Sequence, residues 1–295
     1  MHAQTPREDR HHVMSFNQAV IEEFRANAGR VGGPFEGAGL ILLTTTGARS
    51  GREHTTPLGR PRGPGGQGMY VVASAGGSDR HPDWYRNLLA RPLVRVETGT
   101  EVYEAVAVPA EGARREELFA HIVREEPGYG EYQRKTRRVI PVVELQRTHE
   151  AEGAEDAESA EDGIAGMLTR VHGWLRAQIA ELLRLPAGES APVGMQLRQH
   201  CLAFCQTLEA HHTGEDTGLF PWLAERHPQL AGFFRRLEEE HRDIERTQTR
   251  IAGLIRGGGD QAAVREELEA LSRELLAHLD REEAELLPVL RALAA

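Results

Sequence analysis

A histidine and carboxylate pattern that occurs twice in the C-terminal third constrains this chain more than any other feature. The first copy runs from His211 to Pro221 and the second from His278 to Pro288. In each copy a carboxylate follows the histidine by four residues, a second carboxylate lies next to it, and the proline comes ten residues after the histidine. Residues four apart lie on one helix face, with Cβ atoms about 5–6 Å apart. The pattern predicts two helices that each direct a histidine and a carboxylate to one place.

Two further histidines extend the predicted ligand set. His241 lies sixteen residues before the turn Gly257–Asp260, and His278 lies eighteen residues after it. Antiparallel helices joined at this turn bring the two histidines to nearly the same height. Imidazole and carboxylate ligands suit iron, and helical bundles hold two iron ions with such ligands. We therefore predict a di-iron site in a four-helix bundle with these ligands: His172, His211, Glu215, His241, His278 and Glu282.

Neighbouring polar residues leave alternatives open. His211 is preferred to His212 because it matches His278 when the two prolines are aligned. His200 lies about 16 Å from His211 along a helix, so we place it outside the ligand set. Four other residues are expected to face solvent or to hold the ligands from outside: His212, Asp216, Glu283 and Glu285. Whether His200, His212 or Asp216 joins the metal site stays open.

This stretch, over about residues 163–293, resembles the hemerythrin-like (HHE) cation-binding domains. The resemblance is carried by these residues: His172, His211, Glu215, Leu219–Pro221, His241, His278, Glu282 and Leu287–Pro288. It implies an up-down four-helix bundle with two iron ions that binds or senses iron, oxygen (O2) or nitric oxide (NO). Oxygen-carrying hemerythrins use five histidines, so the four found here favour sensing over simple oxygen carriage. Iron storage is a weaker alternative.

The chain is long enough for two domains. Residues 148–163 are acidic and rich in alanine and contain no large apolar side chain, so they are interpreted as a linker. Residues 1–15 form a polar tail. The predicted domains are therefore an N-terminal domain over 16–147 and a helical domain over 164–295.

Composition excludes several classes of protein. No apolar run approaches the roughly 20 residues of a membrane span. Met1–Arg10 lacks the apolar core of a secretory signal, which favours a cytoplasmic location. The net charge of −10 argues against nucleic-acid binding. Cys201 and Cys205, four apart on a predicted helix, are expected to pack as small apolar residues. The oligomeric state stays open, with a homodimer as one option.

The pattern changes in the N-terminal half, where strands outnumber helices. Without regular βαβ spacing, these segments predict an α+β domain built on a small β-barrel rather than a doubly wound sheet. Gly63–Gly68 precedes a strand, so it is a hairpin loop and not a dinucleotide fingerprint. The expected strands are Leu40–Thr46, Met69–Ser74, Leu93–Thr98 and Glu101–Val108, and the expected helices are Phe16–Asn27 and Ala113–Glu125.

Three polar clusters, Thr44–Leu58, Ala73–Leu88 and Tyr129–Val143, follow one another in this half. Hydroxyl groups, glycine amides and arginines in one turn can hold a phosphate or an acidic tail. Together the clusters resemble the deazaflavin-dependent nitroreductase family over about residues 16–147. The resemblance implies a split β-barrel of the flavin-binding type and the deazaflavin coenzyme F-420, with flavin mononucleotide (FMN) as the alternative.

The same resemblance implies a role for individual residues. The coenzyme's phosphate and tail are held by Arg49, Ser50, Gly51, Thr56 and Pro57. The deazaflavin ring is lined by Ser74, Ala75, Gly76, Trp84 and Asn87. Tyr129 or Tyr132 faces the substrate, where a phenol can serve as hydrogen-bond or proton donor. Packing inside the barrel is the alternative role for both tyrosines.

The implied reaction is hydride transfer to a small-molecule electron acceptor: a nitro compound, a quinone or an activated alkene. The coenzyme carries this chemistry, and the protein supplies position and electrostatics. The alternative function is a non-catalytic iron-sensing or gas-sensing protein whose barrel only holds a ligand.

Overall fold

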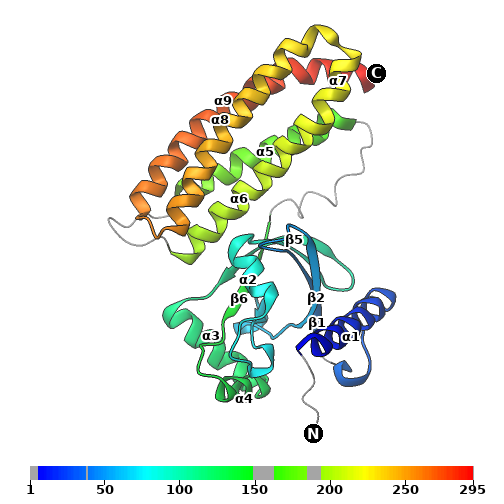
Figure 1. Ribbon diagram of the computed structural model, residues 1–295, viewed down its shortest axis with the longest axis vertical. Helices are drawn as coiled ribbons and strands as arrows, with labels where there is room; N and C mark the ends of the chain where they lie inside the picture. The colour runs from blue at the N-terminus through cyan, green and yellow to red at the C-terminus, as the bar shows by residue number, and fades with distance from the viewer. Residues whose placement is uncertain (1–5, 38, 149–162, 185–193, 295) are drawn as a thin grey trace. The chain divides into compact units, whose positions relative to one another are not determined.

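The computed structural model describes residues 6–37, 39–148, 163–184 and 194–294. The chain divides into two compact units, Met1–Thr148 and His149–Ala295 (Figure 1). Most of the predicted linker lies outside the described residues. Its first residue, Thr148, is buried and donates a hydrogen bond to the carbonyl of Glu104, and its last, Gly163, begins a helix.

The N-terminal unit is built on a curled antiparallel sheet. Its strands lie in the order β2-β1-β4-β5-β6-β3, and every neighbouring pair is antiparallel. The sheet therefore forms a half-barrel. The strands are β1 (Leu40–Thr46), β2 (Glu53–Gly59), β3 (Tyr70–Val72), β4 (Leu93–Glu97), β5 (Val102–Pro109) and β6 (Val142–Arg147). The helices of this unit are α1 (Pro6–Ala26), α2 (Asp83–Ala90), α3 (Gly112–Glu125) and α4 (Gly128–Lys135).

Strand β1 forms at Leu40–Thr46, where the continuous apolar run predicts a strand. Ile41, Leu42 and Leu43 are fully buried, because the sheet is covered on both faces at this strand. On one face, Phe24 of α1 packs with Leu42 in a shared cluster. The strands expected at Leu93–Thr98 and Glu101–Val108 form β4 and β5, which pair antiparallel as a hairpin.

Several elements differ from the sequence-based expectation. Helix α1 begins at Pro6, so part of the predicted polar tail is helical; proline suits the first turn of a helix. Strands β2 and β6 and helices α2 and α4 were not predicted. Strand β2 contains Pro57 and is partly exposed, and an edge position tolerates a proline that lacks an N–H. The polar composition of β2 is therefore the reason why the sequence did not predict this strand.

The C-terminal unit consists of long helices that run side by side in Figure 1. Helix α5 packs against α6 and α9, and α8 packs against the same two helices, so the four enclose a common core. The predicted turn at Gly257–Asp260 is confirmed, and a second helix end lies at His227. The helices are α5 (Gly163–Arg184), α6 (Met195–Gly214), α7 (Phe220–Arg226), α8 (Ala231–Arg256) and α9 (Gln261–Ala294), and a π-helical turn, η5 (Glu215–Leu219), joins α6 to α7. Among the described residues, no helix is long and apolar enough to cross a membrane.

Core packing in this unit generates a stability prediction. Leu271 of α9 is fully buried in the main apolar cluster, whereas Leu293 of the same helix is 46% exposed. We expect Leu271→Ala to lower the free energy of unfolding by about 2–5 kcal/mol, because it leaves a cavity. Leu293→Ala, the matched control, should change it by less than about 0.5 kcal/mol. Urea denaturation followed by circular dichroism measures both, and equal effects would contradict the assigned core.

Candidate functional site

Polar side chains converge in the middle of the helical unit, although the surrounding core is apolar. His172, Glu215, His241, His278 and Glu282 are all at most 4% exposed. They come from α5, η5, α8 and α9, so separate segments of the helical unit contribute to one site. His211 and His212, at the end of α6, lie beside them. The potential ligand atoms of all these residues form two groups, and within each group every atom lies within 4.8 Å of the others.

The first group comprises His172, His211, Glu215 and Glu282. His211 Nε2 lies 3.3 Å from Glu215 Oε1, four residues later on the same helical run. His172 Nε2 lies 3.5 Å from Glu282 Oε2. Two imidazoles and two carboxylates thus face one point.

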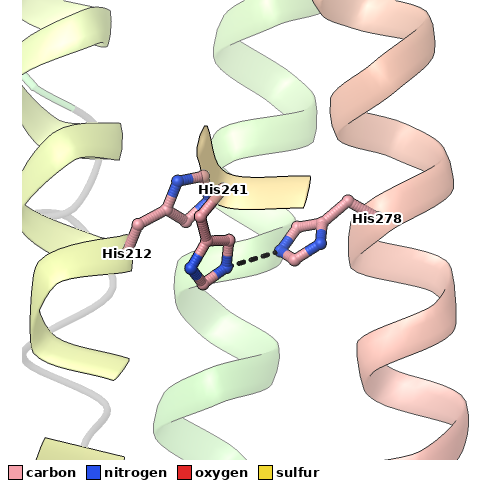
Figure 2. Close-up of side chains that lie close together, drawn as sticks. All are labelled: His212, His241 and His278. Carbon is pink, nitrogen blue, oxygen red and sulfur yellow. Dashed lines mark hydrogen bonds between the residues drawn. The ribbon is translucent and has the colours of Figure 1, made fainter. Parts of the chain in front are cut away.

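The second group comprises His212, His241 and His278, which Figure 2 shows in close-up. The rings of His212 and His241 stack with centroids 3.9 Å apart. The Nε2 atoms of His241 and His278 are 3.1 Å apart, the contact drawn as a dashed line. Bonds of about 2.1 Å to one ion at roughly a right angle place two nitrogen ligands about 3 Å apart. The spacing therefore matches two ligands of a single ion.

Outer carboxylates fix the orientation of three of these imidazoles. The Nδ1 atom of His172 contacts Glu283 Oε1 at 2.9 Å. The Nδ1 atoms of His241 and His278 contact Asp216 Oδ1 at 2.8 Å and Glu240 Oε2 at 2.9 Å. Because an ionised carboxylate only accepts hydrogen bonds, each Nδ1 donates and each Nε2 keeps a lone pair.

This arrangement has an electrostatic consequence at the centre. His241 and His278 direct two Nε2 lone pairs at each other, and no proton lies between them in this tautomer. Such a contact is repulsive unless a cation lies beside both nitrogens. The geometry therefore favours a bound cation.

Both buried carboxylates connect the two groups. Glu282 Oε2 lies 3.5 Å from Nε2 of His172 and 3.5 Å from Nε2 of His278. Glu215 directs Oε1 towards His211 and places Oε2 3.6 Å from Nε2 of His241. Each carboxylate can thus bridge two ions.

Buried polar atoms without a hydrogen-bond partner support the same conclusion. An unpaired buried polar group costs about 1–3 kcal/mol, and more when it is charged. Several such atoms in one place are explained by a ligand that satisfies them together. Among the residues that the structure describes, they include Nε2 of His172, His211 and His212 and both carboxylate oxygens of Glu215 and Glu282.

Burial keeps the imidazoles neutral and therefore able to bind a metal. It lowers the pKa of His172 to about 4 and the pKa values of His211 and His241 to about 3. It raises the pKa of Glu282 to about 7, and burial followed by repulsion from Glu282 raises the pKa of Glu215. Because burial disfavours the charged form of these carboxylates, a nearby positive ion would stabilise that charged form strongly.

The structure brings together all six residues that the sequence predicts as ligands. His212, whose place was left open, is buried within the second group and does not face solvent. The two groups therefore contain five histidines, so the count of four that favoured sensing over oxygen carriage was wrong. Adjacent residues on a helix point about 100° apart, so two neighbouring histidines can each face a different ion. Asp216 and Glu283 hold ligand imidazoles as expected, whereas Glu240 was missed. His200 contacts Gln196 and lies outside both groups.

A cavity of about 1770 Å³ marks the N-terminal unit. Its lining includes Tyr129, Tyr132 and Ser74, three of the residues expected at the coenzyme and substrate site. Tyr129 lies over β2, since a Cβ atom on Gly59 would come within 2.9 Å of its Oη. Burial, and then the charge of Glu126, raises the pKa of Tyr129, so its hydroxyl keeps its proton. The cavity thus has a protonated phenol at its wall.

The loop Ala73–Ser78 beside this cavity has an unusual backbone. Ala75 has a φ of 47°, which is strained for a residue other than glycine, and the two glycines after it also have positive φ. The guanidinium of Arg138 donates hydrogen bonds of 2.7–2.9 Å to three carbonyl oxygens of the loop. Arg138 thereby holds the loop that carries Ser74.

Other predicted coenzyme residues lie elsewhere. Trp84 is buried and packs edge-on against Tyr85. Asn87 donates to Thr45 Oγ1 and accepts from the Ala48 amide, so its side chain connects α2 to the end of β1. The described lining of the cavity also does not include these residues: Arg49, Ser50, Gly51, Thr56, Pro57, Ala75 and Gly76.

Three arginines that sequence reasoning did not select do line the cavity. Arg30, Arg60 and Arg62 are exposed at its edge. Arg60 and Arg62 directly follow β2. The pair of basic residues after Gly59 was the sequence feature that could have indicated them as binding residues. These side chains can contact an anionic group.

The buried histidines predict how the metal-free protein responds to acid. Unfolding returns each imidazole to an ordinary pKa near 6.5, so below that pH the unfolded state binds more protons. Glu215 and Glu282 oppose this, because their raised pKa values favour the folded state below about pH 7. The histidines are more numerous, so stability should fall as the pH falls from 6.5.

We therefore expect the melting temperature of the metal-free helical unit to decrease between pH 7 and pH 5. His212→Gln should weaken this dependence, because burial also lowers the pKa of His212. His54→Gln, at an exposed site in the other unit, is the control and should leave it unchanged. A melting temperature that is constant or rises over this range would contradict the prediction.

Comparison with known proteins assigns a family to each of the two units. Residues 17–147 match the family model described as F-420H(2)-dependent quinone reductase, and residues 163–290 match the hemerythrin HHE cation binding domain. An F-420H(2)-dependent quinone reductase of Mycobacterium tuberculosis (strain H37Rv) is 38% identical over 128 residues, which are 42% of this chain and 85% of that protein. A solved F-420-H2 dependent reductase is 40% identical over 37% of this chain and 94% of its own, with a TM-score of 0.34. A second solved structure, described as a domain-swapped dimer, is 36% identical over 45% of this chain and 96% of its own, with a TM-score of 0.35.

The relative from Mycobacterium tuberculosis is more than 30% identical, and the match spans most of its length. The chain therefore belongs to the F-420H(2)-dependent quinone reductase family, a family of enzymes, and carries a hemerythrin HHE cation-binding domain after its reductase domain.

Proposed function

We propose that the N-terminal unit reduces a quinone with coenzyme F-420. Family membership supports the coenzyme and the acceptor class. The observation that carries the proposal is the cavity of about 1770 Å³ with the Tyr129 side chain in its wall, beside Gly59. Pockets of about 300–1,000 Å³ hold drug-sized ligands, so this one has room for a coenzyme and an acceptor together.

The residues around the cavity fit such a coenzyme. When bound, the reduced deazaflavin ring supplies a hydride. Arg30, Arg60 and Arg62 can hold the anionic tail at the open edge. Ser74 lies on the loop that Arg138 holds in place, which positions it for contact with the ring. The exposed turn at Arg49–Gly51 stays a predicted contact for the tail.

Tyr129 provides the proton or hydrogen bond that the acceptor needs. Negative charge develops on a quinone oxygen as it receives a hydride, and a preorganised donor stabilises that charge. The raised pKa of Tyr129 keeps its hydroxyl protonated over the physiological range. A single phenol at the wall can therefore accelerate the reaction without any metal in this unit.

This role predicts the effect of removing the hydroxyl. Tyr129→Phe should lower kcat for quinone reduction about 100-fold while the affinity for oxidised coenzyme F-420 is retained. Tyr103→Phe is the matched control, since Tyr103 is a buried tyrosine of β5 outside the described cavity lining. Steady-state kinetics and coenzyme fluorescence titration measure the two quantities. An unchanged kcat would remove Tyr129 from the reaction, and coenzyme binding without any turnover would favour the non-catalytic alternative.

We further propose that the helical unit binds two iron ions. The mixed imidazole and carboxylate set suits iron, and the two bridging carboxylates suit a pair of ions. One ion takes His172 and His211, and the other takes His212, His241 and His278. The ion with two histidines has one protein ligand fewer. That difference leaves it the place for a small ligand such as O2 or NO, which supports a binding or sensing role.

Iron content tests this set directly. The double variant His211→Ala, His278→Ala removes one ligand from each ion and should reduce iron from about two per chain to nearly none. His200→Ala, a histidine of α6 outside both groups, is the control and should retain the iron. Iron is measured by elemental analysis after identical purification. Iron that survives the double change would show that the ions bind elsewhere.

A further inference from the structure

The three pairs between a ligand imidazole and an outer carboxylate each join two different segments of the helical unit. Such a pair fixes the orientation of the ligand only if the carboxylate is itself held in place. The groups that hold the carboxylates therefore matter for the metal centre. The pairs are His172 of α5 with Glu283 of α9, His278 of α9 with Glu240 of α8, and His241 of α8 with Asp216 of η5.

Arg176 of α5 holds the first of these carboxylates. Its Nη1 donates to Glu283 Oε1 at 2.6 Å, and the same oxygen accepts from Nδ1 of His172 at 2.9 Å. Its Nη2 donates to Asp280 Oδ1 at 2.8 Å, so two carboxylates of α9 hold the guanidinium. A continuous chain of hydrogen bonds thus runs from His172 in the core to Asp280, whose side chain is 73% exposed.

Arg281 of α9 holds the second carboxylate. Its Nε and Nη2 lie 3.0 Å and 2.9 Å from Glu240 Oε1. The other oxygen of this carboxylate, Oε2, accepts from Nδ1 of His278 at 2.9 Å. The guanidinium and the imidazole therefore hold Glu240 from opposite sides, and Glu240 cannot turn towards water without breaking contacts to both.

The third carboxylate is held differently. Over the ranges that the structure describes, Asp216 forms an ion pair with His241 and with no arginine. Aspartate has one rotatable bond fewer than glutamate, so less conformational freedom has to be removed to fix it. Glu283 and Glu240 have side chains that are 22% and 27% exposed, and both need a partner that keeps them turned inward. The arginines thus occur at the two carboxylates with the longer side chain.

We propose that Arg176 and Arg281 are positioning residues of the metal centre, and that each fixes one ligand through its carboxylate. In the proposed function, on which this inference rests for the ions themselves, His172 binds one ion and His278 the other. Each ion therefore has one ligand that an arginine secures. The alternative role is an ordinary ion pair between helices, and such pairs between exposed side chains contribute little to stability.

The variants Arg176→Met and Arg281→Met remove the charge and the donors and keep the apolar stem. Arg250→Met is the matched control. Arg250 of α8 and Glu267 of α9 form an ion pair at 3.0 Å and have side chains that are 51% and 24% exposed, against 51% and 27% for Arg281 and Glu240. The control therefore breaks an equally exposed ion pair between the same two helices, at a place where neither partner contacts a ligand.

Release of iron from the full chain to an excess of chelator is the first measurement. Removal of an outer partner of a ligand typically weakens metal binding about 10–100-fold, and the arginines act one step further out, so we expect release to be about threefold to tenfold faster. Arg250→Met should release iron as the parent does. In a Glu283→Gln background, Arg176→Met should add little, because the two residues act through one chain of hydrogen bonds.

The metal-free chain gives a second measurement that needs no iron. An imidazole N–H that is held in a buried hydrogen bond exchanges slowly with water and gives a resolved nuclear magnetic resonance signal. Arg176→Met should abolish the Nδ1–H signal of His172 and keep that of His278. Arg281→Met should do the reverse, and the control variant should keep both signals.

Three results would overturn the proposal: iron release at the parental rate in both arginine variants, an equal acceleration by Arg250→Met, or Nδ1–H signals that no variant changes. A parent chain that binds no iron would contradict the proposed metal centre. The histidine signals would then decide this inference alone, because loss of one signal for each arginine would still show that the arginine fixes that imidazole.

Discussion

Two imidazole nitrogens that face each other at 3.1 Å determine how the helical unit is organised. His241 and His278 come from different helices, so their contact is stable only if a cation offsets the repulsion between their lone pairs. The core is accordingly interrupted by a polar layer. Along α9, Leu275 belongs to one apolar cluster and Leu286 to another, and the ligands His278 and Glu282 lie between them. The apolar clusters pack the helices together on either side of the polar layer, and the proposed ions would satisfy the polar atoms that the clusters cannot.

The sequence predicted the ligands that share a periodic spacing, because helix geometry converts spacing into a common face. It did not predict Glu240, whose contact with His278 depends on how α8 and α9 pack, nor the inward position of His212. Periodic spacing selects one direction per helix, whereas a pair of ions would accept ligands from two adjacent positions. The π-helical turn at Glu215–Leu219, which brings that carboxylate into the core, left no signal in the composition.

In the N-terminal unit the same limit applies to the sheet. Strand β1 was predicted because it is buried on both faces and apolar throughout, while β2 was missed because an edge strand can be polar and can contain Pro57. The cavity depends on that missed strand: Gly59 lies at its end, and the absence of a side chain there admits the Tyr129 hydroxyl. Arg60 and Arg62 follow it into the cavity edge. Motif similarity identified the tyrosines, and only the pairing of the strands brought the arginines to them.

The cofactors proposed for the two units would perform different kinds of electron chemistry. A reduced deazaflavin gives up electrons as a hydride, in pairs, whereas an iron ion changes its charge by one electron at a time. Direct reduction of the iron by the coenzyme is therefore disfavoured. Quinones and quinols exchange electrons singly or in pairs, so the acceptor class proposed at Tyr129 can exchange electrons with either kind of centre.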